Sequence, residues 1–108
     1  MSRKPDNKEE AYLLERLKEI YGSLAVKPRA IGGDAQTPHH QWEHKYRNTD
    51  GFTVQKDHWD KICARAALED TNPVLVVKNK HQQRLAVLRL EDLLTLLSGW
   101  ERWQQDLG

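Results

Sequence analysis

The sequence predicts a single α/β (α+β) domain in which a central mixed β-sheet is flanked by helices. Segments whose apolar residues recur every three or four positions, as in amphipathic helices, alternate with short segments typical of strands. The 108 residues suit one compact domain, and 38% hydrophobic against 31% charged residues is a globular composition. We therefore expect one domain over residues 8–108, preceded by a polar tail at residues 1–7.

The first helix is predicted from about Lys8 to Tyr21. Asp6 or Asn7 can cap its start, and Gly22 can end it. The apolar residues that set its three-and-four spacing are Ala11, Leu13, Leu14, Leu17, Ile20 and Tyr21.

Two turns frame the next predicted strand. Residues 23–31 can form a short strand that leads into a loop, and Gly32-Gly33-Asp34 is a turn signal. Residues 35–39 are polar and contain a proline. Gln41–Arg47 alternates aromatic and polar side chains with period two, which predicts a half-buried strand. Asn48–Gly51 is the second turn.

The second half of the chain predicts a helix, a β-hairpin and a last helix. In order, the segments are a helix at about Lys56–Glu69, a buried strand at Val74–Val77, a loop at Asn79–Gln83, a return strand at Leu85–Leu88 and a helix at about Glu91–Gln105.

Bulk properties favour a cytoplasmic protein without a membrane segment. No run approaches the about 20 apolar residues of a membrane span, and Met1–Glu10 lacks the apolar region of a secretory signal. The single cysteine, Cys63, cannot form an internal disulfide. The net charge of +1 does not by itself indicate a nucleic-acid binder, although basic residues near loops and strand ends allow a local basic surface.

The candidate chemistry lies in Asp34, Glu43 and Lys45. Residues two apart on a strand share a face, so Glu43 and Lys45 project together while His44 faces the other way. An aspartate in the turn before the strand can approach the same place. Two carboxylates suit Mg²⁺ or Mn²⁺, which take oxygen ligands and keep several waters. A lysine beside such an ion can orient water or stabilise developing charge.

A chain with this many charged residues can contain an acid-x-lysine triplet by chance. The evidence for a functional site is therefore the position of the triplet among the predicted elements. The order of elements and motifs resembles the PD-(D/E)xK nuclease superfamily, and more closely its small phage-type and archaeal-type Holliday junction resolvases. Ala30–Asp34 resembles the family's Gly-Asp element, and Trp42–Lys45 resembles its Glu-x-Lys strand. The resemblance covers about residues 8–97. Trp42 departs from it, because the family more often has an aliphatic residue there.

The resemblance implies a restriction-endonuclease-like fold and a Mg²⁺-dependent (or Mn²⁺-dependent) DNA endonuclease, acting on branched DNA in recombination or repair in a bacterial host or a phage. It implies that Asp34 and Glu43 bind the metal together with the backbone carbonyl of His44. It also implies that Lys45 serves the attacking water. These roles remain expectations at this point.

A glutamate of the first helix completes the site in the family. Glu10 matches it best and is our fourth catalytic candidate, with Glu9 and Glu15 as alternatives. A solvated helix face explains these glutamates equally well. For DNA contacts we expect the basic side chains near loops and strand ends, namely Lys27, Arg29, His40, Arg47 and Lys56.

Other interpretations remain open. His39, His40 and His44 could form a zinc site, but adjacent histidines on an extended segment point in opposite directions. The chain could also be a non-catalytic DNA- or protein-binding accessory or inhibitor on the same scaffold, which the near-neutral charge favours. A resolvase must cut two strands symmetrically and would need a homodimer. Trp100 and Trp103 on the last helix fit either packing or a dimer contact.

Overall fold

The computed structural model describes the backbone of residues 5–27 and 34–107 and the side chains of residues 8–27 and 34–102. The elements, in chain order, are α1 (Pro5–Tyr21), the 3₁₀ helix η1 (Gly22–Leu24), β1 (Ala35–Thr37), β2 (His40–Tyr46), α2 (Lys56–Leu68), β3 (Asn72–Lys78), β4 (Arg84–Val87) and α3 (Leu90–Leu107). Arg29, an expected DNA contact, and the expected turn residues Gly32 and Gly33 lie outside the described residues.

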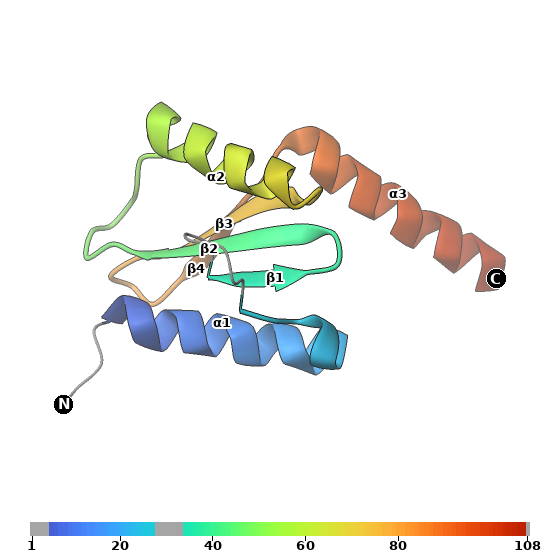
Figure 1. The fold of residues 1–108 in the computed structure, drawn as a ribbon, viewed down its shortest axis with the longest axis horizontal. Coiled ribbons are helices and arrows are strands. Elements are labelled where there is room, and N and C mark those ends of the chain that lie inside the picture. Colours follow the sequence, from blue (N-terminus) through green and yellow to red (C-terminus); the bar gives the residue numbers. More distant parts are fainter. Residues whose placement is uncertain (1–4, 28–33, 108) are drawn as a thin grey trace.

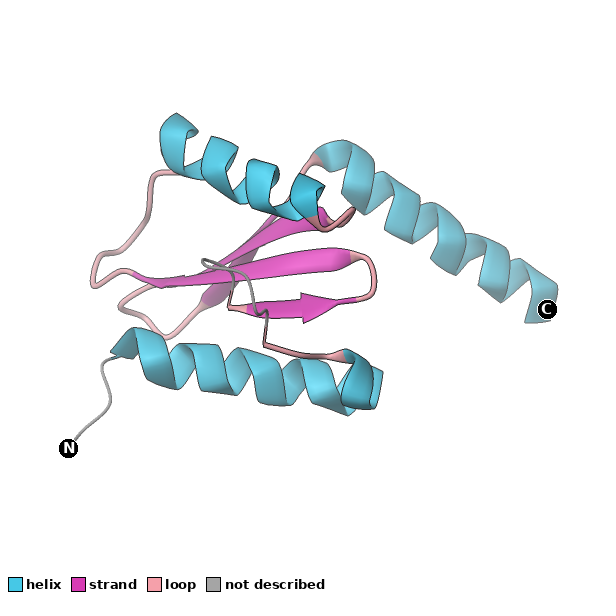
Figure 2. Cartoon of the chain, in the orientation of Figure 1, coloured by secondary structure: helices cyan, strands magenta, loops and turns pink. Residues whose placement is uncertain are grey.

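A four-stranded mixed sheet forms the centre of the domain, in the order β1-β2-β3-β4. β1 is antiparallel to β2, β2 is parallel to β3, and β4 is antiparallel to β3. The parallel pair is joined through α2, as a parallel connection requires a long crossover. α1 and α2 lie on opposite sides of this sheet, whereas α3 extends away from it (Figures 1 and 2). The predicted single-domain α+β class is confirmed.

Two small cores hold the helices to the sheet. On the α1 side the buried residues are Leu13, Leu17, Ala25, Ala35, Val74 and Val76. On the α2 side they are Ile62, Leu75 and Val77. Successive residues of β3 therefore face different helices, and this two-sided burial explains why Val74–Val77 is a continuous apolar run rather than an alternating one.

Apart from the strand expected within residues 23–31, the predicted helices and strands are present, and their bounds differ from the expected ones by up to three residues. α1 begins at Pro5, so part of the expected polar tail is helical; proline is well suited to the first turn of a helix. α1 ends at Tyr21, and Gly22 takes a left-handed conformation with φ of 60°, which confirms the predicted terminator. No helix in the described part of the chain has the length and apolar character that crossing a membrane requires.

β1 is the element that the sequence did not indicate. Ala35–Thr37 pairs with β2 in the register Ala35–Trp42 and Thr37–His40. The Trp42 Nε1 donates a hydrogen bond of 3.0 Å to Thr37 Oγ1 across the hairpin. In the described part of residues 23–31 the expected strand was wrong: Gly22–Leu24 is a 3₁₀ helix, and only Val26 makes a bridge, to Gln36.

Candidate active site

β2 separates two polar clusters that lie on opposite faces of the sheet. Glu43 contacts Arg65 of α2, and Lys45 Nζ lies 3.8 Å from Glu43 Oε1 on the same side. The side chain of His44 points the other way, toward Glu9 of α1. The alternation predicted for this strand, with Glu43 and Lys45 together and His44 opposed, is confirmed.

Asp34 lies beside Glu43 because of the β1–β2 register. Ala35 pairs with Trp42, so the residue before Ala35 comes opposite the residue after Trp42. The backbone N–H of Asp34 donates to the Trp42 carbonyl at 2.9 Å, and Asp34 Oδ2 accepts a hydrogen bond of 2.6 Å from the backbone N–H of His44. Asp34, Glu43 and Lys45 are therefore held around one short segment of β2.

Two carboxylates in this place affect each other electrostatically. The side chain of Glu43 is only 10% exposed. Burial raises the pKa of Glu43, and the charge of Asp34 raises it further, whereas Arg65 and Lys45 act in the opposite direction. Arg65 Nη1 donates to Glu43 Oε2 at 3.1 Å. An additional cation at this place would stabilise both ionised carboxylates.

The donor set fits a hard divalent cation better than zinc. Asp34 and Glu43 supply carboxylate oxygens, and Mg²⁺ is commonly bound by one or two carboxylates while it keeps several waters. Among the described residues there is no group of three or more His, Cys, Asp or Glu side chains arranged to hold a metal. The three neighbouring histidines thus form no such group, and a magnesium site here would rest on two carboxylates, the His44 carbonyl and water.

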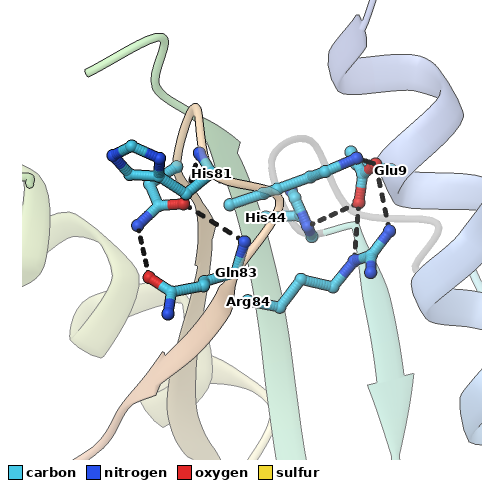
Figure 3. A network of polar contacts seen from close by, with 7 residues as sticks. Glu9, His44, His81, Gln83 and Arg84 are labelled. Carbon is cyan, nitrogen blue, oxygen red and sulfur yellow. Dashed lines mark hydrogen bonds and ion pairs between the residues drawn. The ribbon is translucent and has the colours of Figure 1, made fainter. Parts of the chain in front are cut away.

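Glu9 of α1 occupies the opposite cluster (Figure 3). Its carboxylate is 2.6 Å from Lys78 Nζ, 3.0 Å from Arg84 Nε and 3.4 Å from His44 Nε2. Burial raises the pKa of Glu9, but the hydrogen bonds from Lys78 and Arg84 outweigh it, so the pKa lies below its ordinary value. Glu9 therefore lies on the face of the sheet opposite to the one that carries Glu43.

The other two first-helix glutamates are placed differently. Glu10 is half-buried on α1, and Glu15 is exposed on the same helix. α1 packs on the face of the sheet that carries His44, not on the face that carries Glu43. The assignment of Glu10 to the catalytic group stays a prediction.

A basic surface adjoins Glu43 on the α2 side, and we define it as Arg47, His58, Lys61 and Arg65. Burial lowers the pKa of His58, and the positive charges of Lys45, Arg47, Arg65 and Lys61 lower it further. In the part of the chain that the structure describes, neither Arg47 nor Lys61 has an acidic partner. Such a surface attracts an anion.

Sequence reasoning missed His58, Lys61 and Arg65. The available signal was their spacing of three and four on α2, which places them on one helix face. An open hollow lies at the start of the same helix, lined by Gln55, Lys56, Asp57, His58 and Lys61.

The expected DNA contacts have separate positions. Arg47 belongs to the basic surface. Lys56 is exposed at the start of α2, and its Nζ pairs with Asp60 Oδ2 at 2.6 Å. Lys27 is exposed after η1. His40 is buried with 7% exposure and its ring centre lies 6.0 Å from that of Trp42, so the structure does not bring it to the basic surface.

Comparisons with known proteins add no relative to this picture. No family model, curated protein or solved structure matches the chain. The functional interpretation therefore depends on the residues at the Asp34–Glu43 site and on their geometry.

Proposed function

We propose that the protein is a Mg²⁺-dependent or Mn²⁺-dependent endonuclease that hydrolyses phosphodiester bonds of DNA, with Asp34, Glu43 and Lys45 at its active site. The carrying observation is the 2.6 Å hydrogen bond from the His44 N–H to Asp34 Oδ2. It fixes the first carboxylate beside the strand that bears the second carboxylate and the lysine.

The topology supports the more specific proposal of a restriction-endonuclease-like fold. Asp34 directly precedes β1, the Glu-x-Lys sequence lies on β2, and a crossover helix then leads to the parallel strand β3. This is the order that the resemblance to PD-(D/E)xK nucleases implies. The branched DNA of a resolvase is the substrate class that the closer resemblance favours.

The chemistry assigned to these residues follows from their groups. Asp34 and Glu43 would bind the cation with the His44 carbonyl; when bound, it supplies charge neutralisation at the phosphodiester and activation of a water. Lys45 Nζ, 3.8 Å from Glu43 Oε1 and one-third exposed, is placed to orient the attacking water or stabilise charge on the phosphorus-bound oxygens. The imidazole of His44 is turned to the other face and takes no part.

The basic surface would position the DNA backbone. Arg47 and Lys61 lack acidic partners among the described residues, and the charges of both, like that of Lys45, lower the pKa of His58. Lysine and arginine contacts to phosphates fix the register of a nucleic acid without reading its sequence. This surface is therefore suited to a structure-selective enzyme.

The test is cleavage by Asp34→Ala and Lys45→Ala in Mg²⁺. Each should lower the cleavage rate by roughly 100-fold or more, because a group acting on the transition state is removed. DNA binding and the circular dichroism spectrum should change little. Lys18→Ala, on the exposed face of α1, is the matched lysine control and should cut normally. Full activity in either site variant would overturn the proposal.

One observation favours the second candidate, a non-catalytic accessory or inhibitor on the same scaffold. Glu43 already has both oxygens facing protein cations, Arg65 Nη1 at 3.1 Å and Lys45 Nζ at 3.8 Å. A protein of this kind would bind DNA or another protein and leave DNA uncut in Mg²⁺.

A further inference from the structure

Arg65 reaches the carboxylate of Glu43 from a different element, the middle of α2. Its Nη1 lies 3.1 Å from Glu43 Oε2, and the other oxygen of Glu43 faces Lys45 Nζ at 3.8 Å. Because the side chain of Glu43 is only 10% exposed, few waters compete for these oxygens. The carboxylate that would bind the metal is thus satisfied by protein cations.

A divalent cation held by Asp34 and Glu43 would need the same oxygens. Arg65 donates directly to Oε2, so the guanidinium and the cation compete for one acceptor, and their like charges repel at short range. Lys45 makes the longer contact and can stay near the site without occupying a lone pair of Glu43. Arg65 is therefore the group that has to leave.

The side chain of Arg65 is also open to a partner from solvent. Its side chain is 35% exposed, so it borders solvent, and it shares one face of α2 with His58 and Lys61 of the basic surface. The planar guanidinium offers several donors in a fork that matches two oxygens of a phosphate. A DNA phosphate on this surface would meet Arg65 directly.

We propose that Arg65 is an exchange residue, which pairs with Glu43 in the metal-free protein and with a DNA phosphate once a divalent cation has taken its place. This inference rests on the proposed function. It implies that metal binding and DNA binding strengthen each other, since coupling between two sites is reciprocal. Lys61 shares the basic surface but has no ion pair with Glu43, which makes it the matched control.

The first arm measures Mn²⁺ binding without DNA by titration calorimetry. Arg65→Ala and the longer Arg65→Gln should bind Mn²⁺ about tenfold more tightly than the wild type, because a competing charge-assisted hydrogen bond is removed. Lys61→Ala should bind Mn²⁺ like the wild type. Thermal unfolding checks that the variants fold, and Arg65→Gln keeps the test valid should Arg65→Ala be unfolded.

The second arm measures affinity for a DNA four-way junction by fluorescence anisotropy, in EDTA and in Ca²⁺, which has the same preference for oxygen ligands. The wild type should bind several-fold more tightly in Ca²⁺. Both Arg65 variants should lose this gain, whereas Lys61→Ala should bind more weakly in both buffers and keep it.

The outcomes separate the two levels of the proposal. Equal Mn²⁺ affinity in the wild type and both Arg65 variants, or a Ca²⁺ gain that both retain, would overturn the exchange and leave the metal site standing. Absence of Mn²⁺ binding in the wild type and in both Arg65 variants would overturn the metal site itself, and the exchange with it.

Discussion

A single residue, Glu9, connects α1 to three strands of the sheet. It contacts Lys78 of β3, Arg84 of β4 and His44 of β2, and the ring of Tyr12 lies 3.8 Å below the guanidinium of Arg84. Glu9→Gln should lower the free energy of unfolding by about 3 kcal/mol, the lower end for breaking a buried pair, because Arg84 is one-third exposed.

The stabilisation by Glu9 should depend on pH in a defined direction. The folded protein lowers the pKa of Glu9 below its ordinary 4.5, so the stabilisation is present above pH 4.5 and is lost as the pH falls through the lowered pKa. Urea unfolding of wild type and Glu9→Gln at neutral and acidic pH should show a difference that shrinks on acidification. An unchanged difference would contradict this role.

The raised pKa of Glu43 should make metal binding depend on pH. Burial and the charge of Asp34 raise its pKa above 4.5, and binding of a cation requires the ionised form. Mn²⁺ affinity should therefore already weaken above pH 4.5 as the pH is lowered. In Arg65→Ala the weakening should begin at a higher pH, because Arg65 lowers the pKa of Glu43. Affinity that stays constant down to pH 4.5 would contradict the assignment of Glu43 as a ligand.

The residues that could be predicted from sequence are those set by local rules. The common face of Glu43 and Lys45 follows from strand alternation, and Asp34 follows from a turn signal beside that strand. The contacts of Arg65 with Glu43 and of Glu9 with Lys78 could not be predicted, because they join residues that are 22 and 69 positions apart in the sequence. Such contacts depend on how the helices pack on the sheet.

α3 exposes many apolar side chains. An apolar stripe runs along its exposed side, formed by Leu90, Leu93, Leu94, Leu97 and Trp100 at helical spacing. We propose that two copies of the protein pair through this stripe. A two-fold dimer would present two active sites to the two DNA strands that a resolvase cuts.

The proposed dimer can be tested by measuring the size of the protein in solution. Leu94→Glu should shift a dimer to a monomer in sedimentation velocity, because a charge would be buried in an apolar contact. Thr95→Glu, next to Leu94 but outside the apolar stripe, is the matched control and should leave the dimer intact. A wild type that is monomeric at all concentrations would contradict the proposal.

Among the elements, β1 shows why pattern reading fails for short strands. Its three residues carry no alternation long enough to recognise, and its pairing is held by contacts such as Trp42 Nε1 to Thr37 Oγ1. α2, in contrast, has a full helical period over 13 residues and was predicted to within one residue. Length of the periodic segment decided the outcome.

On the scale of the whole molecule, the near-neutral net charge of +1 hides a local basic surface. Affinity for DNA should fall with salt concentration, and Arg47→Ala and Lys61→Ala should each reduce the slope of log affinity against log salt by about 1. Anisotropy titrations over a salt series measure this slope. Lys18→Ala on α1 should leave it unchanged, and an equal loss in Lys18→Ala would mean that binding is not confined to this surface.

The fold class was accessible from the sequence because it follows from the order and periods of the segments. The relation of the clusters to the sheet was not accessible: only the packing shows that Glu9 and Glu43 lie on opposite faces. The more specific fold and the nuclease activity remain proposals that depend on the Asp34–Glu43–Lys45 arrangement.

The most direct measurement is incubation of the wild-type protein with supercoiled plasmid and with a DNA four-way junction, in Mg²⁺, in Mn²⁺ and in EDTA. Cutting in Mg²⁺ and none in EDTA is the predicted result, and preference for the junction would identify branched DNA as the substrate. Both DNAs bound but intact in Mg²⁺ and in Mn²⁺ would contradict the nuclease assignment and favour the accessory protein instead.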